Sequence, residues 1–174
     1  MLKPIAIIIV ILLAALLIYA TTRPDTFRVE RTVNIKAPPE KIFGFINDFR
    51  RWEAWTPFNK DLAMKKTYSG ASEGVGAIYE WDGNKDVGKG SVEITESLPP
   101  SKISIKLDFI KPFEVHNTAE FTLKSQDETT DVTWATYGQQ PLIGKVMSIF
   151  FDCDKMLGTD FENGLAKLKA QAEM

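Results

Sequence analysis

The sequence predicts an α+β fold in which a curved antiparallel sheet of seven strands wraps around a long C-terminal helix. Two observations predict this fold. Residues 142–172 repeat apolar side chains every three or four positions, as on one face of a helix. Residues 27–137 read almost entirely as short alternating strands separated by turns. An amphipathic helix and a sheet with one apolar face bury both surfaces when they pack together, and a cavity between the two layers is expected.

The first apolar segment, residues 5–20, contains no charged side chain and follows Lys3. A spanning helix needs about 20 apolar residues, whereas a signal peptide has a shorter apolar region and a small residue three positions before its cleavage site. Cleavage after Ala20 would place Ile18 there, which fits poorly. We therefore expect a single-pass membrane protein with an anchor (or signal peptide) in residues 1–22, a linker in 23–26 and a domain in 27–174. We expect that domain outside the cytoplasm, in the periplasm if the source is bacterial.

The strands and short helices follow in order. Residues 27–36 alternate between apolar and polar side chains and predict the first strand. Pro38 and Pro39 suit the first turn of a helix, where backbone N–H groups lack partners, and a second short helical piece extends to Pro57. Six further strands are predicted at residues 64–69, 77–81, 87–98, 102–109, 113–123 and 130–137.

The C-terminal helix is expected to bury a continuous stripe formed by Val146, Phe150, Cys153, Leu157, Phe161, Leu165 and Leu168. Within it, Gly158 is followed by Thr159 and Glu162, which have the spacing of a capping box. We therefore expect a kink or a helix restart at Gly158. Cys153, the single cysteine, is interpreted as a small core residue.

Alternation along the strands predicts a concave face rich in aromatic side chains and poor in charge. Trp52 and Trp55 can plug one end of the sheet and helix layers; alternatively, Trp55 and Phe58 line the mouth of the cavity. The candidate ligand-binding residues are Trp55, Phe58, Tyr79, Trp81, Ile94, Ile103, Ile105, Phe109, Asn117, Phe121, Trp134, Phe150 and Leu157.

Composition argues against several classes of function. The net charge is −2 and no block of like charges occurs, so nucleic acid is not an expected partner. His116 and Cys153 are the only histidine and cysteine, so neither a metal site nor a bound cofactor is expected. Alternation turns His116 outward, away from any nucleophile on the concave face. Proton transfer would require Glu53, Glu80 or Glu96 to enter the cavity, where burial raises the pKa of a carboxyl group.

Three local strings carry a family resemblance: residues 35–43 (IKAPPEKIF), 52–57 (WEAWTP) and 160–165 (DFENGL). Together with the order of elements, they resemble the polyketide cyclase/dehydrase-like branch of the START-like (SRPBCC, helix-grip) superfamily. The resemblance implies a deep apolar cavity between sheet and helix, which different members use for lipids, sterols, quinones or polyketide intermediates. It also implies that an N-terminal anchor is typical, and it transfers no catalytic residue, because the branch shares no catalytic set.

We therefore predict a membrane-anchored module that binds or transports a hydrophobic small molecule or lipid without a cofactor. Two alternatives remain open: a cyclase- or dehydratase-like enzyme, and a protein-interaction module whose cavity is only a packing feature.

Overall fold

Seven strands form one antiparallel sheet in the computed structural model, which describes residues 2–174 apart from the side chains of residues 2, 3 and 6. The strands are β1 (Thr26–Ile35), β2 (Lys65–Gly70), β3 (Ala77–Asp82), β4 (Lys89–Leu98), β5 (Lys102–Lys111), β6 (Val115–Gln126) and β7 (Thr129–Gln139). Their spatial order is β1-β7-β6-β5-β4-β3-β2, so β2 to β7 form a meander and β1 closes the sheet against β7. The strands predicted by alternation are confirmed.

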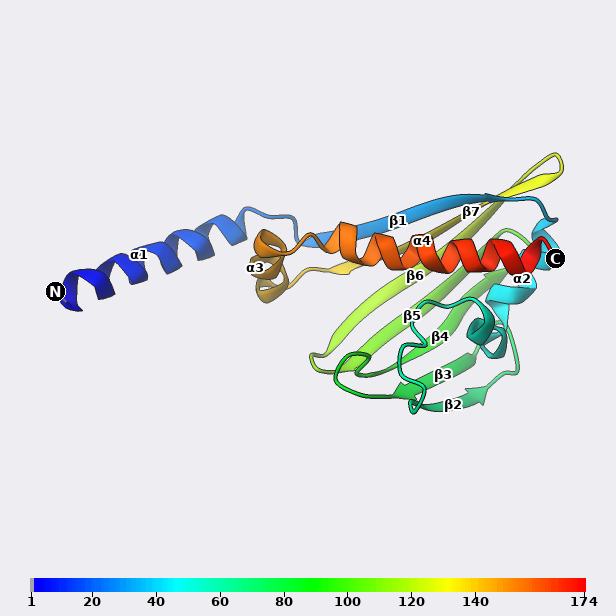
Figure 1. Cartoon of the computed structure of the whole chain (residues 1–174), viewed down its shortest axis with the longest axis horizontal. Coiled ribbons are helices and arrows are strands. Elements are labelled where there is room, and N and C mark those ends of the chain that lie inside the picture. The colour runs from blue at the N-terminus through cyan, green and yellow to red at the C-terminus, as the bar shows by residue number, and fades with distance from the viewer. Residues whose placement is uncertain (1) are drawn as a thin grey trace.

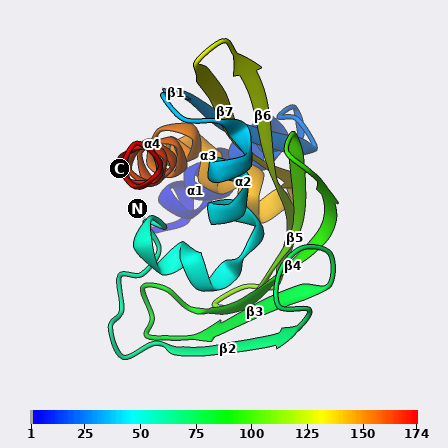
Figure 2. The same cartoon turned by 90° about the vertical axis from the view of Figure 1, so that its right-hand side faces the viewer.

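Five helices accompany the sheet in the described chain: α1 (Leu2–Thr21), α2 (Pro39–Asn47), the 3₁₀ helix η1 (Phe49–Ala54), α3 (Leu142–Phe150) and α4 (Cys153–Ala172). Figure 1 shows α4 lying lengthwise beside β1 and across the sheet, with α1 extending away from the other elements. In the end-on view of Figure 2 the sheet curves from β1 round to β2, and α2 and α4 lie on its concave side. This is the predicted helix-grip arrangement.

The core lies between the concave face and the second half of α4. Trp134 of β7 stacks on Phe161 of α4, with ring centroids 4.2 Å apart and planes 12° from parallel. Phe121 of β6 also stacks on Trp134, and the centroids of these two rings are 5.0 Å apart. These three rings are nearly or completely buried, so they join the two layers.

The C-terminal segment breaks earlier than predicted. α3 ends at Phe150, and α4 restarts with Asp152 as its N-cap, whose carboxylate accepts a hydrogen bond from the Lys155 backbone N–H. Gly158 instead lies buried inside α4. The predicted capping box does not form, because Thr159 donates its hydroxyl to the Lys155 carbonyl and Glu162 binds Arg31. Both side chains are engaged elsewhere, so the expected restart at Gly158 is wrong.

The buried stripe is also shorter than predicted. Phe150 is 64% exposed at the end of α3, and Cys153 is exposed at the start of α4. The covered positions of α4 are those that face the sheet: Gly158, Phe161, Gly164, Leu165, Leu168 and Ala172. The core role expected for Cys153 is therefore wrong, because the buried positions of α4 begin only at Gly158.

The predicted membrane location is wrong. The N-terminal segment forms α1, but no helix among the described residues is both long and apolar enough to cross a bilayer. The predicted transmembrane segment is corrected with it.

Candidate functional site

A cavity of ≈ 330 Å³ lies between the concave face, η1 with the loop that follows it, and α4. One row of the sheet supplies much of its floor. The strand registers place seven residues side by side on one face, one from each strand: Phe27, Gly138, Asn117, Leu107, Val92, Tyr79 and Tyr68. All except Gly138 line the cavity. The cavity therefore extends across the width of the sheet.

The wall opposite this row is formed by helices and the loop. Phe49 and Trp52 of η1, Phe58 of the loop, and Leu157 and Phe161 of α4 contribute apolar side chains to it. The walls are thus mainly aromatic and aliphatic, as is usual in sites that bind small apolar molecules.

Two residues that line the cavity each carry a buried polar atom that has no hydrogen-bond partner in the described chain. These atoms are Nε1 of Trp134 and Oδ1 of Asn117. The other three indole N–H groups all donate to backbone carbonyls: Trp52 to Ile46, Trp55 to Phe45 and Trp81 to Val87. Burial of a polar group without a partner costs free energy, and two of the three such atoms found in the described chain belong to residues that line the cavity.

Four of the five charged residues that line the cavity pair with one another, and the fifth is Asp86. Lys66 binds Glu53 with an N–O distance of 3.0 Å, and Lys60 binds Asp160 at 3.1 Å. The Glu53 side chain is 71% exposed, so it lies at the rim. Each charged side chain of these two pairs therefore has a partner of opposite charge.

Burial raises the pKa of both tyrosines in the cavity floor. Burial is the main cause that raises the pKa of Tyr79 to about 12, with smaller contributions from Tyr68 and Glu53. Burial also raises the pKa of Tyr68. Both hydroxyl groups therefore stay protonated at neutral pH.

The carboxylates considered for proton transfer lie outside the interior. Glu80 is exposed on β3, and Glu96 pairs with Lys102 at 2.7 Å. The hydrogen bonds from Lys102 and then Ser104 lower the pKa of Glu96, which is opposite to the shift needed for a buried acid. His116 is exposed, as alternation predicted, and its Nδ1 lies 2.7 Å from a carboxylate oxygen of Asp108.

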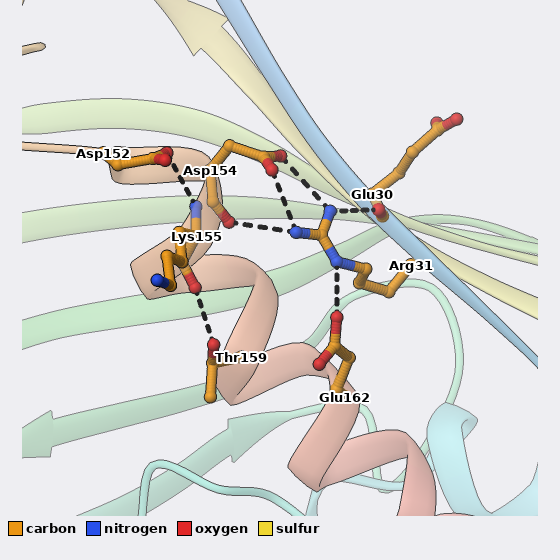
Figure 3. A network of polar contacts seen from close by, with 7 residues as sticks. All are labelled: Glu30, Arg31, Asp152, Asp154, Lys155, Thr159 and Glu162. Carbon is orange, nitrogen blue, oxygen red and sulfur yellow. Dashed lines mark hydrogen bonds and ion pairs between the residues drawn. The ribbon is translucent and has the colours of Figure 1, made fainter.

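Arg31 holds the first half of α4 against β1 (Figure 3). Its guanidinium donates to both carboxylate oxygens of Asp154, at 2.9 and 3.2 Å, and to Glu162 at 2.8 Å. It also donates to the backbone carbonyls of Glu30 and Asp154. A Cβ on Gly158 would overlap this guanidinium, so glycine allows the close approach. The contact positions Leu157 and Phe161 over the cavity.

The structure brings seven of the thirteen candidate residues to the cavity wall: Phe58, Tyr79, Trp81, Phe109, Asn117, Trp134 and Leu157. Five others are fully buried in the core and are absent from the wall: Trp55, Ile94, Ile103, Ile105 and Phe121. Phe150 lies apart, exposed on α3. Alternation identifies a face of the sheet but cannot show which side chains on that face are covered by helix and loop.

Several wall residues escaped the sequence reasoning. Tyr68 follows the same alternation as the residues that were selected, so the pattern of β2 could have identified it. Asn59, Lys60 and Met64 come from an irregular loop with no periodicity to read. Phe27 joins the site only because β1 pairs with β7, far along the chain.

Comparisons with known proteins agree with this architecture. The sequence profile of a family described as "Polyketide cyclase / dehydrase and lipid transport" matches residues 26–173. No curated protein matches the sequence.

Solved structures show the same fold. Protein CV1439 from Chromobacterium violaceum has 18% identity and a TM-score of 0.61, with 87% of this chain and 99% of that chain covered. The Aha1 dimer from Colwellia psychrerythraea has 19% identity and a TM-score of 0.59, with coverages of 85% and 97%. StfQ, a di-domain ARO/CYC protein from the steffimycin biosynthetic pathway, has 13% identity and a TM-score of 0.66, and the match spans 85% of this chain but only 51% of StfQ.

Proposed function

The chain belongs to the polyketide cyclase/dehydrase and lipid transport family, and we propose that it binds a hydrophobic small molecule or lipid in the cavity between sheet and α4. The observation that carries the proposal is the row of residues across all seven strands, six of which line one cavity of ≈ 330 Å³. The candidate site comprises Phe58, Tyr79, Trp81, Phe109, Asn117, Trp134 and Leu157.

Burial of ligand surface supplies the affinity. Each Å² of apolar ligand surface removed from water contributes about 25 cal/mol, and the aromatic walls provide this burial on opposite sides, from the sheet floor and from η1 and α4. The arrangement is preorganised, because Trp134, Phe121 and Phe161 are already stacked. A preorganised wall lowers the entropy lost on binding.

Ligand binding is better supported than an enzymatic reaction in this cavity. Glu53, Glu80 and Glu96, the carboxylates considered for acid or base chemistry, are exposed or paired at the surface. A cyclase- or dehydratase-like reaction needs a proton donor or acceptor within hydrogen-bond reach of the substrate. Binding alone needs only the apolar walls and a few polar anchors.

The test compares two Leu→Trp variants of the full chain. Leu107 is half-buried in the cavity floor, whereas Leu98 lies at the end of β4 and is 50% exposed. Native mass spectrometry of each protein purified from its own host shows whether a hydrophobic molecule co-purifies. Titration with the neutral dye Nile red then measures the affinity of the same samples.

We expect Leu107→Trp to reduce co-purified molecule and dye binding at least several-fold, because the indole occupies the cavity. Leu98→Trp is the matched control and leaves both unchanged. The exposed apolar side chains of α1 also attract dye, so only the part lost in Leu107→Trp reports on the cavity. Equal binding by the wild type and both folded variants contradicts the proposal.

A further inference from the structure

We propose that residues 58–64, the lid segment, form a lid that opens to admit the ligand and closes over the cavity through two polar contacts. This inference rests on the proposed function and adds the route by which the cavity fills. The lid segment lies between η1 and β2 and contains no helix or strand. In Figure 2 the chain between η1 and β2 runs along the open side of the curved sheet.

The lid segment is part of the cavity wall. Four of its seven residues line the cavity: Phe58, Asn59, Lys60 and Met64. The other wall residues belong mainly to the sheet, η1 and α4. Because these four residues belong to one short loop, movement of the loop alone removes a continuous piece of the wall.

Two polar contacts tie the middle of the lid segment to neighbours on opposite sides. Lys60 Nζ lies 3.1 and 3.2 Å from the two carboxylate oxygens of Asp160 on α4. The carboxylate of Asp61 accepts a hydrogen bond of 2.9 Å from the backbone N–H of Asn84, which lies in the turn between β3 and β4. The lid segment therefore bridges α4 and this turn, and the two contacts act as latches.

Little else holds the middle of the lid segment. Among the described residues, one backbone–backbone hydrogen bond involves residues 59–63, and it joins the Met64 N–H to the Asp61 carbonyl inside the lid segment itself. Leu62 is fully exposed and Ala63 is exposed. A segment with few buried apolar contacts and few backbone hydrogen bonds opens at a low cost in free energy.

The ends of the lid segment and the rest of the wall are held more firmly. Met64 is 9% exposed next to β2, and Phe58 meets Trp134 edge to face with ring centroids 6.0 Å apart. Opening the cavity through the sheet would break strand pairs, and opening it through α4 would separate Phe161 from Trp134. Residues 59–63 are therefore the part of the wall that moves at the lowest cost.

The experiment follows Nile red entering and leaving the cavity of the full chain by stopped-flow fluorescence. The signal of Leu107→Trp is subtracted, so that only dye in the cavity is counted. Lys60→Met removes one latch and Asp61→Ala removes the other. Asp61 does not line the cavity, so its replacement cannot act through a lost contact with the dye.

Lys106→Met is the matched control. Lys106 is 53% exposed and lies 2.7 Å from Asp108, whereas Lys60 is 55% exposed and lies 3.1 Å from Asp160. Lys106 and Asp108 both lie outside the cavity wall. The control therefore breaks an ion pair of similar exposure that holds no part of the lid segment.

We expect Lys60→Met and Asp61→Ala each to raise the association and dissociation rate constants together by about 2- to 5-fold, which is the range for an exposed ion pair or hydrogen bond. The latches close the empty and the filled cavity alike, so Kd stays nearly constant. Lys106→Met leaves both rates unchanged. Added NaCl speeds both rates in the wild type but not in Lys60→Met, because ions screen an exposed pair.

The outcomes separate this inference from the proposed function. Unchanged rates in Lys60→Met and Asp61→Ala overturn the inference and leave hydrophobic binding standing. A change confined to the dissociation rate, with a weaker Kd, also overturns it, because that pattern belongs to a group that contacts the ligand. Dye signals that are equal in the wild type and Leu107→Trp overturn the proposed function as well.

Discussion

Replacing Phe161 with alanine tests which part of the C-terminal segment holds the two layers together. Phe161 is 1% exposed and stacks on Trp134 at 4.2 Å, whereas Phe150 is 64% exposed on α3. The apolar periodicity assigns both to one stripe. Phe150→Ala is therefore a matched control that makes the same chemical change at an uncovered position.

The expected magnitudes differ widely. Truncation of a buried phenylalanine costs about 3–5 kcal/mol through lost transfer free energy and the cavity left behind, whereas exposed substitutions change stability by about 0.5 kcal/mol or less. Alanine favours both helices over phenylalanine by less than about 0.7 kcal/mol, so this contribution does not explain a difference. We expect Phe161→Ala to lower the free energy of unfolding by roughly 3 kcal/mol more than Phe150→Ala.

The assay is urea unfolding of the full chain, monitored by far-ultraviolet circular dichroism. The free energy of unfolding is extrapolated to water. A loss of this size is a large share of the roughly 5–15 kcal/mol that stabilises a typical domain, so the midpoint shifts clearly. Equal losses in the two variants refute the reasoning that α4 alone carries the buried stripe. A larger loss in Phe150→Ala refutes it more strongly.

Two further predictions concern pH. The hydrogen bonds from Arg31 lower the pKa of Asp154, so this carboxylate stabilises the fold above its unfolded pKa of 3.8, and the stability falls as acid protonates it below that value. Acid unfolding of Asp154→Asn is expected to be less steep below pH 4 than that of the wild type, and identical profiles contradict the Arg31 contact. At the alkaline end, burial raises the pKa of Tyr79 to about 12, so the folded state is stabilised below pH 10 and loses this contribution as the pH rises toward 12. Titration of tyrosinate absorbance should therefore show a late component that is absent in Tyr79→Phe, and ionisation of every tyrosine near pH 10 in the folded protein would exclude burial of Tyr79.

Local sequence patterns determined much of the architecture. Alternation along each strand reports which side chains share a face, and this local rule predicted all seven strands and the outward position of His116. Pro39 at the start of α2 follows from the missing N–H of proline, which is also a local property. The apolar stripe of the C-terminal segment predicted a helix packed on this sheet, the family resemblance implied the same arrangement, and the structure confirms it.

Only the tertiary structure decided where the C-terminal helix breaks. Gly158 followed by Thr159 and Glu162 has every local sign of a restart, yet Arg31, distant in sequence on β1, binds Glu162 and fills the space above the glycine. Asp152 then supplies the cap in its place. A long-range contact can thus replace a local motif when both use the same side chain, as Glu162 does here.

Tertiary packing also decided which aromatic side chains reach the cavity. Trp55 and Trp134 look equally suitable in sequence, but the fold gives the Trp55 indole a backbone acceptor away from the wall and leaves that of Trp134 unpartnered at the wall. The period of a strand fixes only the direction of a side chain. Which neighbours cover it, and whether its polar atom finds a partner, depends on segments that come together after the chain has folded.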